Sequence, residues 1–212
     1  MTIVYLIRHS MPFREFLGTY DASDTEQLRN EKNILCVEGE ERARKMSEIS
    51  LLCDIDVLYS SHYVRAMSTA KYISLKNRIP LNVDERFGER KFGVQTIKDL
   101  PSDFYERQFK DWNYKIAMGE SLNETSKRMK DALLDILQKY SGKNIAIVSH
   151  GTAISVMLKE WCDVKYNDKT KLVELYFQGK KVFDGDWDVP ELFQLNFENE
   201  KLISIQNIKF KK

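Results

Sequence analysis

Two apolar runs, each ending in a histidine, constrain the fold of this chain more than any other feature. The first, IVYLI, leads directly into Arg8-His9, and the second, IAIV, leads into Ser149-His150. Continuous β-branched runs of this length are typical of strands that are buried on both faces of a parallel sheet. Ligands bind at the carboxyl ends of such strands. Two of the chain's three histidines are therefore predicted to meet in one crevice.

Helical and strand patterns alternate along the rest of the chain. Amphipathic spacing predicts helices, and short apolar stretches bounded by turn residues predict strands. We interpret residues 1–212 as a single α/β domain, because no Pro-, Gly- or Ser-rich linker divides them. Residues 11–33 are too irregular for a regular element and predict a long functional loop. The predicted helices cover residues 38–53, 63–75, 121–140 and 152–161, and the further strands cover residues 55–59, 80–83, 192–197 and 202–208, the last two as a hairpin.

Composition argues against several classes of protein. A net charge of +1 with 31% charged residues gives no overall bias toward nucleic acid or a membrane surface. No stretch approaches the roughly 18 apolar residues of a membrane span, and the N-terminus lacks the features of a signal peptide. The three cysteines include no C-x-x-C pair, which favours a reducing compartment. We therefore expect a cytoplasmic protein that binds neither nucleic acid nor membranes.

Five short segments carry the chemistry-bearing residues of this chain. They are Arg8-His9; Tyr59-Ser60-Ser61 with Arg65-Ala66 and Thr69-Ala70; Glu89-Arg90-Lys91-Phe92-Gly93; Gly119-Glu120-Ser121; and Ser149-His150-Gly151. They resemble, in the same order, the motifs of the histidine phosphatase superfamily, which contains the cofactor-dependent phosphoglycerate mutases. The resemblance covers about residues 3–160, and it implies a three-layer α/β/α sandwich with a mostly parallel central sheet, of the phosphoglycerate mutase-like type.

The residue types in these segments suit phosphoryl transfer without a metal ion or another cofactor. A neutral imidazole is a nucleophile near neutral pH, so His9 can attack phosphorus and carry the phosphoryl group as phosphohistidine. Arg8, Arg65 and His150 can donate hydrogen bonds to the phosphate oxygens and stabilise their charge. An anionic phosphate nearby favours the protonated form of a carboxyl group, so Glu89 can act as the general acid that protonates the leaving alkoxide.

The chain departs from the family pattern just after the first histidine. The family has a glycine where this chain has Ser10. Serine adds a Cβ and a hydroxyl that can crowd a phosphate or donate to it, so Ser10 is a predicted phosphate-binding residue. The segment Met11-Pro12-Phe13-Arg14 lacks the Glu-Ser-x-x-Asn pattern expected of a mutase, and Arg14 is a predicted substrate contact. A metal-independent phosphatase acting on a small phosphorylated metabolite is therefore favoured over a phosphoglycerate mutase-type phosphotransferase.

Other interpretations of the same residues are weaker. Cys36 and Arg42 match the C-x5-R spacing of cysteine phosphatases, but the glutamates between them would repel an anion. Zinc bound by the two histidines and Glu89 is disfavoured by the neighbouring guanidinium groups. Glu85 is the rival to Glu89 as general acid. A non-catalytic protein that binds a phosphorylated ligand, with turnover disabled by Ser10, is the alternative from a different class.

Two predictions concern parts of the chain outside these motifs. Residues 98–120 are rich in aromatic and charged side chains and are predicted to form a helical cap over the site. The last two predicted strands alternate polar and apolar residues and lie at a sheet edge, where pairing with a second copy would give a homodimer.

Overall fold

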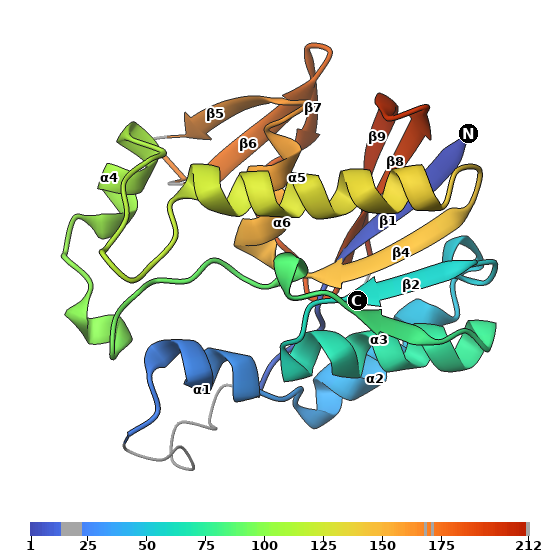
Figure 1. The fold of residues 1–212 in the computed structure, drawn as a ribbon, viewed down its shortest axis with the longest axis horizontal. Coiled ribbons are helices and arrows are strands. Elements are labelled where there is room, and N and C mark those ends of the chain that lie inside the picture. The colour runs from blue at the N-terminus through green and yellow to red at the C-terminus, as the bar shows by residue number, and fades with distance from the viewer. Residues whose placement is uncertain (14–22, 168, 171, 211–212) are drawn as a thin grey trace.

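The centre of the molecule is a mixed, mostly parallel sheet (Figure 1). The computed structural model describes residues 1–13, 23–167, 169–170 and 172–210. Within these residues, six strands follow the spatial order β3-β2-β4-β1-β8-β9, and the parallel part is β3-β2-β4-β1. The six strands are β1 (Thr2–Arg8), β2 (Val57–Ser60), β3 (Leu81–Val83), β4 (Asn144–Ser149), β8 (Glu191–Glu198) and β9 (Lys201–Lys209).

Antiparallel strands extend this sheet on the β1 side. β8 pairs with β1, and β9 pairs with β8 at the edge of the sheet. Asn199 and Glu200 form the turn between β8 and β9 with positive φ angles of 53° and 60°. The predicted strands are confirmed, with boundaries that differ by one or two residues.

Helices cover both faces of the sheet, which confirms the predicted three-layer α/β/α sandwich (Figure 1). The alternation of side chains along β1 sends Val4 and Leu6 to one face and Tyr5 and Ile7 to the other. The first face packs against α5 (Leu122–Lys139) and α6 (Gly151–Leu158). The second face packs against α2 (Val37–Ser47) and α3 (Val64–Asn77). Because both faces are buried, the parallel strands read as continuous apolar runs.

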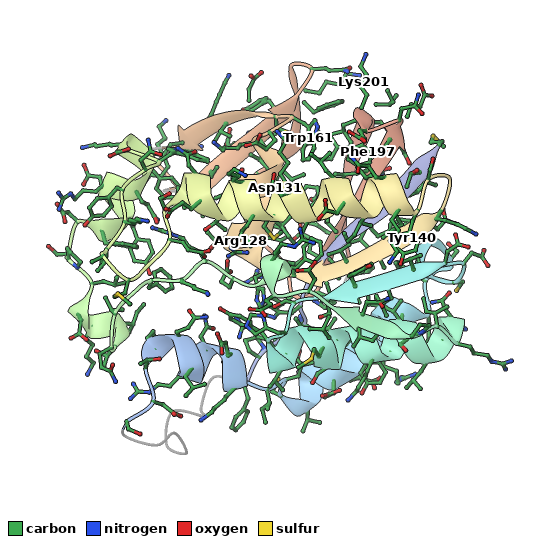
Figure 2. The ribbon with its side chains drawn as sticks, viewed as in Figure 1. Arg128, Asp131, Tyr140, Trp161, Phe197 and Lys201 are labelled. Carbon is green, nitrogen blue, oxygen red and sulfur yellow. The ribbon has the colours of Figure 1, made fainter. Side chains whose placement is uncertain are left out.

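Local capping explains where the helices begin. Ser121 and Glu124 form a capping box at the start of α5, in which the Ser121 hydroxyl accepts from the Glu124 amide at 3.1 Å. The Cys36 sulfur accepts from the Gly39 amide at the start of α2. Just after α6, Trp161 packs edge-on against Phe197, with ring centroids 5.9 Å apart (Figure 2). The predicted helix over residues 38–53 ends earlier, as α2, and a separate 3-10 helix covers Ser50–Leu52.

Several elements differ from the sequence predictions. Helix α1 (Glu26–Lys32) lies within residues 11–33, which were predicted to be irregular. A separate antiparallel sheet of β5 (Asp163–Asn167), β6 (Leu172–Phe177) and β7 (Lys180–Phe183) was not predicted. In the predicted cap, the α-helical part is α4 (Phe104–Lys110), with a 3-10 helix at Ile97–Asp99 before it. These elements are short, and packing rather than a long periodic pattern defines them.

The helices of the described residues include none that is long and apolar enough to cross a membrane.

Candidate active site

The carboxyl ends of β1 and β4 bring the two histidines together. Arg8 lies opposite Ser149 in the parallel pair, and the His9 amide donates to the Ser149 carbonyl at 2.9 Å. Because side chains alternate along a strand, His9 and His150 project toward the α3 layer, while Arg8 projects toward the α6 layer. The two imidazole rings meet edge to face, with centroids 5.1 Å apart.

Arg65, from the first turn of α3, connects the two imidazoles. Its Nε donates to His9 Nε2 at 2.9 Å, and its Nη2 lies 3.1 Å from His150 Nδ1. A third donor of the same guanidinium binds the Asn30 carbonyl. The guanidinium also lies over the Tyr63 ring, 5.0 Å from its centroid. Arg65 is 5% exposed, so it is part of the buried site and is not a solvated helix residue.

These contacts fix which nitrogen of each imidazole carries a hydrogen. His9 Nδ1 lies 2.7 Å from the Ser10 carbonyl, which can only accept, so Nδ1 holds the hydrogen and Nε2 has the lone pair. In His150 the order is reversed, since Nδ1 accepts from Arg65 and Nε2 donates to Ser61 Oγ at 2.8 Å. A nucleophilic lone pair on His9 therefore faces the guanidinium group that can hold a phosphate.

The environment favours the neutral form of both imidazoles. Burial is the largest cause that lowers the pKa of His9 well below its usual value, and the charges of Arg65 and Arg8 add to it, while the hydrogen bond to Ser10 opposes it. Burial and then Arg65 lower the pKa of His150 in the same way. A bound phosphate would offset the arginine charges, so anion binding at this site favours uptake of a proton by the histidines.

The same pKa shifts predict how stability depends on pH. In the unfolded chain, His9 and His150 take up protons below about pH 6.5, whereas in the folded protein they stay neutral to lower pH. The free energy of unfolding should therefore fall as the pH drops from 6.5 to 5.5, by up to about 1.4 kcal/mol per pH unit for each histidine. Urea denaturation in a buffer free of phosphate measures this slope. A double variant, His9→Gln with His150→Gln, should have a clearly shallower slope, and an equal slope would contradict the prediction.

Arg8 approaches the site from the other face of the sheet. Its Nη1 donates to the carbonyls of Trp187 and Asp188, both at 3.3 Å, and the guanidinium lies 5.7 Å from the centroid of the Trp187 ring. Trp187 is itself held by a hydrogen bond from its indole to Ser155 Oγ of α6 at 3.2 Å. The loop before β8 thus orients the Arg8 side chain beside the tip of β1.

Glu89 lies at the N-terminus of α6. Its carboxylate accepts from the amides of Ala153 at 2.9 Å and Thr152 at 3.3 Å, and also from the Arg90 amide. The first amides of a helix have no partner within the helix, and they carry the positive end of its dipole. Helix α6 begins directly after His150, so one helix start positions both groups.

Arg128 holds the segment that carries Glu89, a role that the sequence analysis missed. From α5 (labelled in Figure 2), its guanidinium donates to the carbonyls of Arg86 at 2.7 Å, Gly88 at 3.0 Å and Glu89 at 3.1 Å. Its position on a helix gave no sign of contacts to a loop about 40 residues away. Glu85, the rival acid, is exposed in the 3-10 helix Glu85–Phe87 and does not line the cavity described next.

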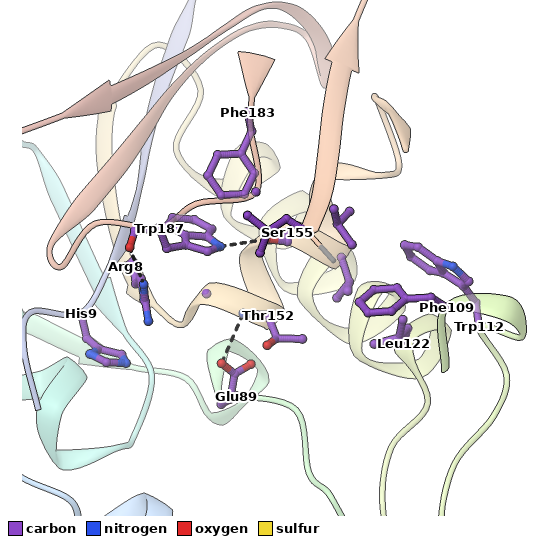
Figure 3. Close-up of a pocket in the computed structure, with 15 residues that line it drawn as sticks. Arg8, His9, Glu89, Phe109, Trp112, Leu122, Thr152, Ser155, Phe183 and Trp187 are labelled. Carbon is purple, nitrogen blue, oxygen red and sulfur yellow. Dashed lines mark hydrogen bonds between the residues drawn. The ribbon is translucent and has the colours of Figure 1, made fainter. Parts of the chain in front are cut away.

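Arg8, His9 and Glu89 line one cavity of about 270 Å³ (Figure 3). Arg65 and His150 support it from behind His9 through the hydrogen bonds described above. The tip of β1, the loop after β3 and the start of α6 thus place a neutral nucleophile, a cation and a carboxyl group around one space. Arg14, the predicted substrate contact, lies outside the described residues.

Ser10 does not point into this cavity. It is fully buried, its hydroxyl donates to the Gly39 carbonyl at 2.7 Å, and its amide donates to Thr69 Oγ1 at 2.9 Å. Both donors of Ser10 are therefore used within the fold. This arrangement does not support the predicted contact between Ser10 and phosphate, nor the prediction that its side chain crowds the anion.

The variant Ser10→Gly should therefore change stability more than activity. We expect kcat/KM to stay within about twofold and the free energy of unfolding to fall by about 1–2 kcal/mol, because a buried hydrogen bond is lost and glycine has a more flexible unfolded chain. Phosphate release and urea denaturation measure the two quantities. Ser10→Ala separates the effect of the hydroxyl from that of backbone flexibility. A tenfold gain in activity in Ser10→Gly would show that the serine does hinder the site.

The structure also bears on the two alternative sites, the cysteine-phosphatase spacing and a metal site. Cys36 caps α2 through its sulfur and does not line the cavity, so the C-x5-R match does not form a phosphate cradle there. Among the described residues, no three His, Cys, Asp or Glu side chains gather in a group that could hold a metal ion.

The site thus places paired buried histidines, two arginines and a carboxyl group at the carboxyl edge of a three-layer α/β/α sandwich. The chain belongs to the histidine phosphatase superfamily (branch 1), whose sequence model matches residues 4–175. The resemblance inferred from the short motifs is thereby confirmed.

Known relatives and solved structures agree with this family. The chain is 29% identical over 161 residues to the uncharacterized phosphatase PhoE of Bacillus subtilis (strain 168), covering 76% of this chain and 77% of that protein. Its fold is similar to a mycobacterial glucosyl-3-phosphoglycerate phosphatase in complex with VO3, with a TM-score of 0.67, 15% identity and 98% coverage of both chains. It is also similar to a mutant phosphoserine phosphatase of Entamoeba histolytica in complex with phosphoserine, with a TM-score of 0.59, 22% identity and coverage of 87% and 95%. The family and its named relatives indicate phosphatase activity.

Proposed function

We propose that this protein is a metal-independent phosphatase that hydrolyses a small phosphorylated metabolite through a phosphohistidine on His9. The observation that carries the proposal is the tautomer of His9. Its Nδ1 hydrogen is held by the Ser10 carbonyl, and its Nε2 lone pair lies 2.9 Å from a guanidinium nitrogen of Arg65. A buried neutral imidazole is suited to attack a bound phosphate when its lone pair accepts only from an arginine that the phosphate can draw to itself.

In the first step, the phosphate of the substrate takes over the Arg65 hydrogen from His9, because an anionic oxygen is a stronger acceptor than a neutral imidazole. His9 Nε2 then bonds to phosphorus while the bond from phosphorus to the ester oxygen breaks. Glu89 gives its proton to the leaving alkoxide. Arg8 and Arg65 stabilise the charge on the phosphate oxygens, in place of a divalent cation. His150 adds to this once it takes up a proton on Nδ1, which the bound anion favours.

In the second step, water replaces the alcohol in the cavity. The Glu89 carboxylate takes a proton from this water as its oxygen attacks phosphorus, and the bond to His9 Nε2 breaks. Inorganic phosphate leaves, and His9 returns to the neutral form with Nδ1 still hydrogen-bonded to Ser10. A mutase would instead return the phosphoryl group to the substrate and would need a bisphosphorylated primer.

The test is hydrolysis of p-nitrophenyl phosphate with and without a chelator, together with an acid or alkaline quench after incubation with ³²P-labelled substrate. We expect turnover that resists the chelator and a protein-bound label that is lost in acid and kept in alkali, as for phosphohistidine. Activity that the chelator removes would overturn the metal-independent mechanism. Binding of vanadate without turnover of any ester would favour the non-catalytic alternative, and dependence on a bisphosphorylated primer would favour a mutase.

The variant Glu89→Gln tests the general acid. Glutamine keeps the size of the side chain but has no proton of suitable acidity to give. We expect kcat for propyl phosphate to fall about 10²–10⁴-fold, and kcat for p-nitrophenyl phosphate to fall far less, because p-nitrophenolate leaves without a proton. Glu85→Gln is the matched control and should change neither rate more than about twofold. Equal losses with both substrates in Glu89→Gln would contradict the assignment.

A further inference from the structure

The cavity that holds Arg8, His9 and Glu89 has a second, apolar end. Figure 3 shows Arg8 and His9 at the left, Glu89 below the centre, and Phe109 and Trp112 at the right, with Trp187 and Phe183 beside and above Arg8. Among the described residues that line the cavity, Arg8 and Glu89 are the only ones with a formal charge at neutral pH, and both belong to the proposed chemistry. Most of the remaining wall is apolar and includes Phe109, Trp112, Leu122, Val173, Phe183 and Trp187.

The apolar end is assembled from two parts of the fold. Phe109 comes from α4, and its ring stacks on Tyr166 of β5, with centroids 5.0 Å apart and planes inclined by 27°. On the other side, Phe183 packs against Trp187 with centroids 4.7 Å apart. The indole of Trp187 is fixed by its hydrogen bond to Ser155. The wall is therefore held in place by contacts that do not depend on a ligand.

Buried Arg90 fastens the segment that carries Phe109 and Trp112. Its side chain binds Gln108 of α4 and donates to the Glu120 carbonyl at 2.8 Å. Its guanidinium lies 5.0 Å from the centroid of the Phe104 ring. Arg90 is 2% exposed and directly follows Glu89, so the apolar wall and the proposed acid share one anchor.

The size of the cavity leaves room for a ring beside the phosphoryl group. A cavity of about 150 Å³ lined by apolar side chains is large enough to bind benzene. This cavity, at about 270 Å³, is continuous with the position of His9, so a group that fills its apolar end is joined to the phosphate that His9 attacks. The natural occupant is the leaving alcohol of the substrate.

The wall also opposes a second anionic group on that alcohol. A carboxylate next to the ester, as in phosphoserine, would face described side chains that offer no cation besides Arg8, which the phosphate itself requires. Lys159 lies behind Trp112 in a neighbouring hollow, with its amine bonded to Asn123 Oδ1 at 2.6 Å. Burying an unpaired carboxylate against such a wall is costly.

We infer that the substrates are phosphomonoesters whose leaving alcohol carries an aromatic or bulky apolar group, and that phosphorylated amino acids and phosphoglycerates are poor substrates. This inference rests on the proposed phosphatase function. It separates this chain from the phosphoserine and glucosyl-3-phosphoglycerate named for the two solved neighbours.

The test compares kcat/KM for 3-phenylpropyl phosphate, propyl phosphate and O-phosphoserine. The first two release alcohols of similar acidity, so their ratio reports binding of the ring and not the quality of the leaving group. We expect 3-phenylpropyl phosphate to exceed propyl phosphate by at least about tenfold, and O-phosphoserine to fall below both. Phe109→Ala and Trp112→Ala should each reduce that ratio by about fivefold or more. Tyr105→Ala, exposed on the same helix and outside the cavity, should leave the ratio unchanged.

The possible outcomes separate the inference from the proposed function. The inference would be overturned, with the phosphatase function intact, if the wild-type protein had equal kcat/KM values for 3-phenylpropyl phosphate and propyl phosphate. It would also be overturned if Phe109→Ala and Trp112→Ala lowered kcat/KM equally for these two substrates. A preference for O-phosphoserine over both alkyl phosphates would also overturn the inference. If the variant Arg14→Ala then lost that preference, Arg14 would be the residue that recognises phosphoserine. Absence of hydrolysis of these esters and of p-nitrophenyl phosphate would overturn both.

Discussion

Replacing His9 by alanine should lower kcat by at least about 10⁴-fold, because the proposed reaction passes through a covalent bond to its Nε2 and no other imidazole or thiol of the described residues lines the cavity. The phosphoenzyme label should disappear along with turnover. Phosphate release under saturating substrate and quench trapping measure the two effects. Vanadate binding should persist in weaker form, because Arg8 and Arg65 remain.

The third histidine provides the control for this experiment. His62 lies outside the cavity, where its ring packs against Tyr63 with centroids 4.8 Å apart. His62→Ala should keep kcat within about threefold of the wild-type value. Thermal unfolding of both variants establishes that they are folded. If His9→Ala retained more than about 1% of the wild-type rate together with the protein-bound label, the phosphoryl group would be carried by a different residue.

The second large effect is expected from Arg65→Met. Arginine groups that stabilise a transferring phosphoryl group contribute about 10³–10⁵-fold to the rate, and Arg65 is the group that contacts both imidazoles. We expect kcat/KM to fall by about 10³-fold or more. The charge of Arg65 also lowers the pKa of His9 and of His150, so removing it should raise both pKa values.

This change predicts a shifted pH profile in addition to a lower rate. Protonated His9 cannot attack phosphorus, so activity falls on the acid side as His9 takes up a proton. In Arg65→Met the acid limb of kcat/KM should lie at higher pH than in the wild-type protein. Arg78→Met, at the exposed C-terminal end of the same helix, should change neither kcat/KM nor the pH at which its acid limb lies. A reduced rate with an unmoved limb would mean that Arg65 binds the substrate without tuning the histidines.

The sequence predicted the positions of the candidate site residues correctly where they lie directly after a strand or at the start of a helix with a clear periodic pattern. The apolar runs before His9 and His150 are the strands β1 and β4, and the capping box at Ser121 begins α5 as predicted. Arg65 was placed near a strand tip because the helix that carries it begins directly after β2. These predictions depend on residues close together in the chain, for which alternation, helical spacing and capping are enough.

The errors arose where partners come from distant segments. The direction of the Ser10 hydroxyl depends on Gly39, and the loop that carries Glu89 depends on Arg128 of a later helix. Short elements such as α1 and the sheet of β5, β6 and β7 have little propensity of their own and form because neighbouring elements cover them.

By itself, the sequence determined the α/β class, the family motifs and the strand tips that deliver Arg8, His9 and His150. It did so because local periodicity decides which face of a strand or helix each side chain occupies. The tertiary structure alone decided that the cavity has apolar walls, since Phe109 and Phe183 lie far apart in the chain and line the same cavity only once α4 and β7 are packed in the fold. Such contacts between distant segments are set by the packing of the whole domain, which no local pattern encodes.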